Sequence, residues 1–394
     1  MYVILYILQF FPSISFNLLS AEIFPWPLLL GIYHVLNSGK INKWIIIIIF
    51  LILSHLVFFS LIRQQEIKLE SVRVLMAYIN GPILYWLILS KYNVYVHIRK
   101  LVNPIFSILI CLGIMQYTNL FSALTPLIQL LVERGMFEQL GGGRGVTLMS
   151  TEPARAGVEL IFIYTFISSY IGDINHRRVY DVLFFLYLIV FIKAFTCFCF
   201  FGLVLFIRYP KFIVSIIFVL LVTSLSLTIE GAGRTMSLLN QLLNSRDLQS
   251  MINILISQSG FRFISVYSAY MFLSENINGG MVGHWANTSL EAIKASGYTT
   301  NEITYFKYHF EDQFVGVRPT SYFANLVLDL GIFAWVLLYF IFRVKEDMFI
   351  VPRELLILFF FSFFFLGTVG NPIPWLVLGL SIKKIRSEKE VART

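Results

Sequence analysis

The sequence is poor in charge: only 13% of its 394 residues are Asp, Glu, Lys or Arg, whereas 58% are hydrophobic. A soluble domain of this length cannot bury that much apolar surface, because its exterior needs more polar side chains than this chain has. The mean hydropathy of +0.78 and the 39 phenylalanines agree with this. The composition therefore excludes a soluble globular protein and predicts an integral membrane protein.

Cysteine is also scarce. Cys111, Cys197 and Cys199 all lie in apolar segments, which argues against a disulfide framework or a thiolate metal site and favours small buried hydrophobic residues. The chain has no G-x-x-x-x-G-K-[ST], no H-E-x-x-H, no D-x-D pair and no paired Cys or His at zinc spacing. These absences argue against nucleotide hydrolysis and metal catalysis, so we expect no cofactor.

Long apolar runs recur from one end of the chain to the other. A helix of roughly 20 apolar residues crosses a hydrocarbon core of about 30 Å, and Trp44–Ile62 is close to that length. The pattern predicts an all-α fold, a polytopic membrane helix bundle formed by a single domain over residues 1–394. The first apolar segment lacks a basic leader and a small-residue cleavage site, so we expect it to be retained. About 12 segments are expected: 2–19, 22–37, 44–62, 74–90, 101–118, 157–172, 179–194, 195–207, 212–229, 321–342, 349–368 and 371–382.

Charge asymmetry predicts the orientation of these segments. If the run Asp181–Ile207 is two segments with a bend near Lys193–Thr196, most basic residues fall in short loops on one side. As a single segment, it would leave Arg208 and Lys211 on the opposite side. The positive-inside rule therefore favours two segments, with the basic loops, the tail 383–394 and both termini in the cytoplasm.

Two larger loops, 119–156 and 230–320, are then expected outside the cytoplasm. Most of the net charge of +8 follows from this topology, so it does not imply nucleic acid as a partner. Any chemistry is expected at the outer membrane face, where these loops lie.

The first outer loop ends in a basic, glycine-rich stretch, GGGRGVTLMSTEPARAG, over residues 141–157. Its glycines let the backbone approach a ligand or a helix closely, while Thr151 and Pro153 suit the start of a helix. A helix N-terminus that faces Arg144 would suit an anion such as phosphate, so Arg144 is a candidate ligand. Glu152 is a candidate base, or an ion-pair partner of Arg144. In the competing interpretation Glu152 only caps the helix and Arg155 reaches lipid headgroups.

The second outer loop ends in a similar way. Arg318 to Gly331 reads RPTSYFANLVLDLG, which repeats the spacing from Arg144 to Gly157, and each glycine is expected inside the start of a span. Arg234 follows two glycines in EGAGR at the other end of this loop. Because guanidinium groups bind phosphate in a bidentate way, the pattern predicts a diphosphate site of three arginines, whereas anchoring to lipid headgroups is the alternative for Arg234.

Histidines narrow the choice of a base. Only His284 and His309 fall in the outer loops, and His284 lies in the glycine-rich turn GGMVGHW. A neutral imidazole there is suited to accept a proton from a sugar hydroxyl, although a lone loop histidine is more often a surface residue. His284 is therefore a second catalytic candidate beside Glu152.

Three patches of this sequence resemble a known family. GGGRGVTLMSTEPARAG followed by a span resembles the R…(S/T)EP…G signature of bacterial O-antigen polymerases of the Wzy type. RPTSYFANLVLDLG resembles their second arginine motif, and EIFPW over residues 22–26 is similar to their N-terminal region. By this resemblance Arg144 and Glu152 belong to the first motif and Arg318 to the second, whereas Arg234 and His284 fit by loop context.

The resemblance implies a GT-C-like glycosyltransferase of the bacterial inner membrane that uses neither metal nor nucleotide. It would transfer a growing polysaccharide from its undecaprenyl diphosphate carrier to the non-reducing end of a new lipid-linked repeat unit at the periplasmic face. The implied partners are these lipid-linked units, membrane lipid, a Wzz-type chain-length regulator and a Wzx-type flippase. Two alternatives stay open: an O-antigen ligase, and a flippase or other transporter of lipid-linked oligosaccharides.

Overall fold

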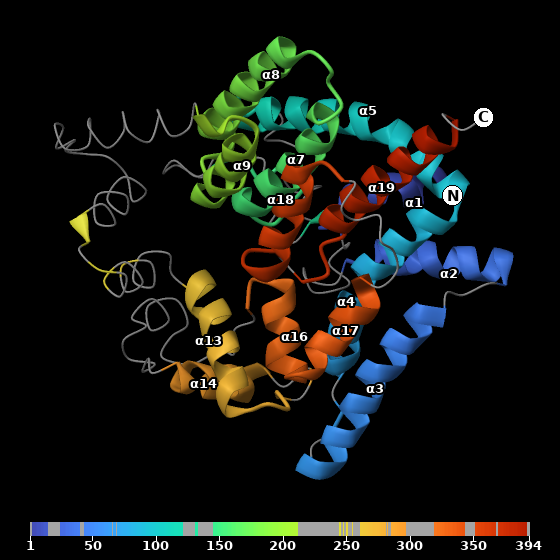
Figure 1. Ribbon diagram of the computed structural model, residues 1–394, viewed down its shortest axis with the longest axis vertical. Helices are drawn as coiled ribbons and strands as arrows, with labels where there is room; N and C mark the ends of the chain where they lie inside the picture. The colour runs from blue at the N-terminus through green and yellow to red at the C-terminus, as the bar shows by residue number, and fades with distance from the viewer. Residues whose placement is uncertain are drawn as a thin grey trace.

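The computed structural model describes residues 2–14, 24–39, 43–64, 66–67, 69–120, 131–132, 145–211, 244–245, 247, 250, 254, 261–280, 282, 285–296, 319–342, 351–367 and 369–391. Every regular element within these residues is helical (Figure 1), as the composition predicts. In the described part of the chain, three helices are long and apolar enough to cross a membrane, at Ile45–Ile62, Ser71–Ser90 and Tyr92–Tyr117, and two shorter apolar helices lie at Thr196–Arg208 and Phe333–Phe342. The count of about 12 spans stays a prediction.

Most of the helices overlap predicted apolar segments, whereas α13 and α14 lie within the predicted outer loop 230–320. Their bounds are α1 Tyr2–Leu8, α2 Trp26–Ser38, α3 Lys43–Arg63, α4 Leu69–Ser90, α5 Tyr92–Tyr117, α7 Pro153–Ser168, α8 Ile174–Tyr187, the π-helix η2 Leu188–Ile192, α9 Phe195–Arg208, α13 Phe261–Glu275, α14 Trp285–Ala295, α16 Tyr322–Leu330, α17 Phe333–Phe342, α18 Arg353–Phe364 and α19 Ile373–Val391.

Helix α4 is the packing centre of the bundle. Helices α2, α3, α5 and α19 all contact it, and its Tyr78, Leu84 and Leu87 are buried. Gly81 of α4 allows Trp375 of α19 to pack directly against the backbone, because a side chain there would overlap the indole ring. On the periphery, α3 projects from the bundle and exposes apolar side chains such as Phe50, as expected for a surface in contact with lipid (Figure 1).

The predicted bend within Asp181–Ile207 is confirmed. The chain turns at Lys193, whose φ of 53° ends the π-helix η2 and whose N–H donates to the carbonyl of Leu188 over 2.9 Å. Helix α9 then returns along α8, which places the ring of Phe201 5.1 Å from that of Phe184 (Figure 1). The sequence 174–208 is therefore a helical hairpin and not one tilted helix.

Some predicted boundaries are wrong. Helix α5 begins at Tyr92, so Arg99 and Lys100, which we expected in a short loop, lie on a helix. Helix α1 ends at Leu8, well before the predicted end of the first segment. Long polar side chains on a helix beside apolar neighbours do not end it, because Lys and Arg propagate helices nearly as well as Leu does.

The predicted span 321–342 is broken at Gly331. This residue has a φ of 56° and separates α16 from α17. The turn 276–280 packs against the break, since Ile332 N–H donates to Ile277 O over 2.8 Å and Gly280 N–H donates to Leu328 O over 2.7 Å. A side chain on Gly331 would overlap the backbone of this turn.

The break also corrects the comparison of the two Arg-to-Gly spacings. Gly157 lies inside α7, where it lets the side chain of Cys197 approach the helix. Gly331 instead ends α16. The two glycines thus have different structural roles, and the expectation that both lie inside the start of a span is wrong for Gly331.

Replacement of Gly331 tests the break. We expect Gly331→Ala to lower the free energy of unfolding by about 2 to 4 kcal/mol, because it adds backbone strain and forces the turn 276–280 to shift. Gly39→Ala is the matched control: Gly39 has a similar φ of 62°, but its side-chain position faces open space, so strain alone should cost about 1 kcal/mol. Thermal unfolding of the purified protein in detergent measures both, and equal losses would contradict the packing described.

Candidate functional site

Of the five predicted site residues, the structure describes Glu152. Arg144, Arg234, His284 and Arg318 lie outside the described residues, so their positions stay predictions. The chain that directly follows Arg144 is described, however, from Gly145 through α7. The candidate site is therefore built from this segment and the residues that it contacts.

The segment after Arg144 is fixed to neighbouring helices. A side chain on Gly145 would overlap the carbonyl oxygen of Ile192, and Val146 N–H donates to Phe191 O over 2.8 Å. The amide of Gln116 on α5 pairs with both the N–H and the carbonyl of Leu148, each over 2.8 Å. The glycine after Arg144 is thus needed for a close backbone approach, whereas the run 141–143, for which the sequence predicts such an approach, lies outside the described residues.

Glu152 stands at the start of α7. It is the N-cap residue, with φ −146° and ψ 146°, and Pro153 occupies the first helical position as predicted. The prediction that Thr151 is the cap is wrong by one residue. The Glu152 side chain makes no capping hydrogen bond and is exposed, where its negative charge is favourable beside the positive end of the helix dipole.

Arg155 lies in the first turn of α7, and its side chain packs against Phe24. Its guanidinium carbon lies 5.6 Å from the centre of the Phe24 ring. Its Nη1 is buried and has no hydrogen-bond partner among the described residues. One nitrogen of Arg155 therefore faces protein, while the residue as a whole is half-buried, and the interpretation that Arg155 reaches lipid headgroups stays a prediction.

Glu159 lies one helical turn beyond Arg155 and is only 8% exposed. Its carboxylate accepts a hydrogen bond from Asn371 Nδ2 over 3.2 Å, and the positive charge of Arg155 acts on it. Asn371 is held in place because its Oδ1 accepts from Ile373 N–H over 3.0 Å, at the start of α19. A buried carboxylate is costly unless it is paired in this way, so its presence requires an explanation.

Two of the three sequence patches that resemble polymerase motifs contact α4, and the third contacts one of these two. Phe24 of EIFPW accepts a hydrogen bond at its carbonyl from Asn80 Nδ2 over 2.6 Å, and its ring contacts Arg155 of STEPARAG. Tyr322 of the second arginine motif donates to the carbonyl of Tyr78 over 2.5 Å. Phe24 and Tyr322, which are far apart in the sequence, therefore both bond to α4, at Asn80 and Tyr78.

We call Phe24, Asn80, Arg155, Glu159 and Asn371 the α7 cluster. Phe24 and Arg155 belong to motifs that the sequence predicts to be functional, whereas Asn80, Glu159 and Asn371 were not predicted from the sequence. A signal was present for Glu159, which is an acidic residue inside a predicted span, a placement that usually marks a functional position. The two asparagines carry no comparable signal, because an amide in an apolar segment has no fixed role.

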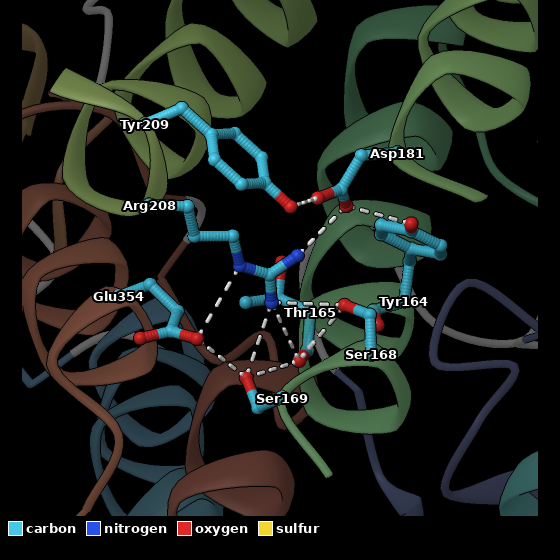
Figure 2. A network of polar contacts seen from close by, with 8 residues as sticks. All are labelled: Tyr164, Thr165, Ser168, Ser169, Asp181, Arg208, Tyr209 and Glu354. Atoms are coloured by element: carbon cyan, nitrogen blue, oxygen red, sulfur yellow. Dashed lines mark hydrogen bonds and ion pairs between the residues drawn. The ribbon is translucent and has the colours of Figure 1, made fainter. Parts of the chain in front are cut away.

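A second buried polar network surrounds Arg208 (Figure 2). Its Nη1 lies 2.7 Å from Asp181 Oδ1 and its Nε lies 3.3 Å from Glu354 Oε1. Its Nη2 donates to the Ser168 and Ser169 hydroxyls over 2.9 and 3.2 Å. The Arg208 and Asp181 side chains are only 3% and 2% exposed, so Arg208 is not the exposed loop charge that the sequence predicted.

Two phenols complete the Arg208 network. Tyr164 donates to Asp181 Oδ1 over 2.7 Å and Tyr209 donates to Asp181 Oδ2 over 2.9 Å. Burial raises the pKa of the Tyr209 phenol, and its hydrogen bond to Asp181 acts in the same direction. The network joins α7, α8, α9 and α18, and the guanidinium nitrogens each have a partner, which indicates a structural role.

Removal of the central cation tests this role. We expect Arg208→Met to lower the free energy of unfolding by about 3 to 5 kcal/mol, because it leaves the buried Asp181 carboxylate without its cation. Lys100→Met, which removes an exposed cation on α5, is the control and should change it by less than about 0.5 kcal/mol. Chemical unfolding in detergent compares the two, and a tolerated Arg208→Met would show that the network does not stabilise the bundle.

The chain was also compared with known proteins. No family model matches it, and neither the curated proteins nor the solved structures gave a match. The functional argument therefore rests on the residues and contacts of this chain.

Proposed function

We propose that the protein is a Wzy-type O-antigen polymerase, a metal-independent glycosyltransferase that joins undecaprenyl-diphosphate-linked repeat units. The observation that supports this most is the α7 cluster. There, Arg155 of STEPARAG contacts Phe24 of EIFPW, and Phe24 bonds to α4, which also contacts the helix that follows Arg318. If the three short patches contribute to one site, that site explains why they are present together in one chain.

The proposed topology has about 12 spans, with both termini in the cytoplasm and the active face in the periplasm. The three long apolar helices support a location in the membrane, which is the inner membrane for this function. The loops 119–156 and 230–320 then face the lipid-linked substrates. A Wzx-type flippase would supply these units, and a Wzz-type regulator would set the chain length.

The chemistry requires groups that stabilise the leaving diphosphate. Its charge grows in the transition state, and fixed guanidinium groups at a low-dielectric interface stabilise that charge. We assign this role to Arg144, Arg234 and Arg318. Glu152 or His284 deprotonates the acceptor hydroxyl or orients the group that does.

The backbone directly after two of these arginines is fixed by contacts with the bundle, which supports this assignment. Gly145, directly after Arg144, packs against the backbone of Ile192. On the other side, the carbonyl of Pro319, directly after Arg318, accepts a hydrogen bond from the buried Asn325. A short tether to fixed backbone lowers the entropy lost when an arginine binds its anion.

Loss of the arginines tests the function. In a strain whose own gene is deleted, we expect Arg144→Ala and Arg318→Ala to reduce long O-antigen chains by about 100-fold or more, since each removes a charged donor from the leaving group. Arg178→Ala, at an exposed position on α8, is the control and should restore full-length chains. Lipopolysaccharide banding on a gel, at matched protein abundance, gives the result.

The same gel separates the competing functions. Loss of a polymerase leaves the lipid A core with one repeat unit, whereas loss of a ligase or a flippase leaves the bare core. Full-length chains from both arginine variants at normal abundance would refute the proposed diphosphate site. A bare core in the deletion strain would refute the polymerase itself.

A further inference from the structure

We infer that Glu159, with Arg155 and Asn371, binds the hydroxyl of the acceptor sugar, and that the Glu159 carboxylate takes its proton. This inference rests on the proposed function, because it names the acceptor site of that reaction. It differs from the exposed Glu152, which is seven residues earlier, at the start of the same helix. Glu152 then has an orienting role.

Glu159 has the free hydrogen-bonding capacity that a base needs. An ionised carboxylate offers about four acceptor positions. Among the described residues, Glu159 uses one of them for a side-chain hydrogen bond, to Asn371 Nδ2. Because Asn371 is fixed by its own bond to the start of α19, this contact holds the carboxylate in one orientation and leaves its other positions open.

Arg155 supplies an unused donor next to this carboxylate. Residues four apart on a helix lie on the same face, so Arg155 and Glu159 are neighbours on α7. The guanidinium is oriented by the Phe24 ring, and its buried Nη1 has no hydrogen-bond partner in the part of the chain that the structure describes. Buried polar atoms in native proteins are nearly always satisfied, so such a group points to a bound molecule.

The combination of charges selects a hydroxyl. A phosphate offers only acceptors and would be repelled by the Glu159 carboxylate, whereas a metal cation would be repelled by the Arg155 guanidinium. A sugar hydroxyl is both a donor and an acceptor, so it can donate to Glu159 and accept from Arg155. Asn80 adds to this pattern, since its Nδ2 is bonded to Phe24 O while its buried Oδ1 has no partner among the described residues.

The depth of Glu159 also suits the reaction. Seven residues of α-helix place its backbone about 10 Å from that of Glu152 along the axis, since each residue rises about 1.5 Å. The acceptor hydroxyl would therefore lie deeper than the exposed start of α7, beside Glu159.

The step balances without a further reactant. The acceptor oxygen forms a bond to the anomeric carbon of the growing chain, while the bond from that carbon to the diphosphate oxygen breaks. The electron pair of the broken bond leaves with the diphosphate, and the hydroxyl proton moves to the Glu159 carboxylate. Undecaprenyl diphosphate departs, and Glu159 later returns its proton to water.

Two variants test the site in the complemented deletion strain. Glu159→Gln keeps the size of the side chain and its contact with Asn371 but removes the base, so we expect long chains to fall about 100-fold or more. A merely structural role would predict the opposite, because a neutral amide is easier to bury than a carboxylate. Glu275→Gln, at an exposed position at the end of α13, is the control and should restore full-length chains.

Arg155→Met is the independent arm of the test. It keeps an apolar stem against Phe24 and removes the donor, so we expect long chains to fall about 10-fold or more, with part of the loss restored by Arg155→Lys. If the Glu159→Gln protein does not accumulate, the chain lengths obtained with the Arg155 variants decide whether the acceptor site exists. Full-length chains from either Glu159→Gln or Arg155→Met at wild-type abundance would overturn the acceptor site.

The test also separates this inference from the proposed function. If the deletion strain shows the lipid A core with one unit and the wild-type gene restores long chains, the polymerase stands whatever the variants do. If the deletion strain shows a bare core, the proposed function fails first, and the acceptor site fails with it.

Discussion

Every polar side chain buried in this apolar bundle needs a partner supplied by the protein itself. Water is not available in a hydrocarbon core, and an unpaired buried charge or amide costs several kcal/mol. Two clusters of the bundle meet this requirement to different extents. Around Arg208, a cation, two carboxylates and four hydroxyls bond to one another, and four helices are joined (Figure 2). In the α7 cluster the bonding is incomplete, since the buried nitrogen of Arg155 and the amide oxygen of Asn80 lack partners among the described residues.

Because of this difference, we assign a structural role to the Arg208 network and a binding role to the α7 cluster. A complete network stabilises the packing of helices and leaves nothing with which to bind a ligand. An incomplete one that is held rigidly by ring contacts and fixed amides is prepared for a molecule with matching donors and acceptors. Helix α4 connects this site to the rest of the bundle, because it bonds to the Phe24 carbonyl, contacts α16 through Tyr78 and packs on α19. Helix α4 therefore supports two of the motif patches directly, and the third through Phe24.

Much of the fold can be predicted from hydropathy and charge, and each wrong or missing prediction has a physical cause. The helical class and the turn at Lys193 were predictable, because apolar run lengths and charge asymmetry depend on the membrane alone. The break at Gly331 was not, since it depends on a turn some fifty residues earlier that inserts its backbone there. The close approach of Gly145 was not predicted, because its partner, the backbone of Ile192, is more than forty residues away in the sequence. The pairing of Glu159 with Asn371 was not, because more than two hundred residues separate the two side chains. The buried position of Arg208 was also missed, since a basic residue at a span end is usually exposed.

The central claim is that this chain alone joins lipid-linked repeat units without metal or nucleotide. The most direct measurement incubates the purified protein in liposomes with undecaprenyl-diphosphate-linked units extracted from the deletion strain, in the presence of EDTA. Our account predicts a ladder of lipid-linked chains that differ by one repeat unit, with release of undecaprenyl diphosphate for every bond formed. Units that stay single while the protein remains folded, or chain growth that stops when EDTA is added, would contradict it.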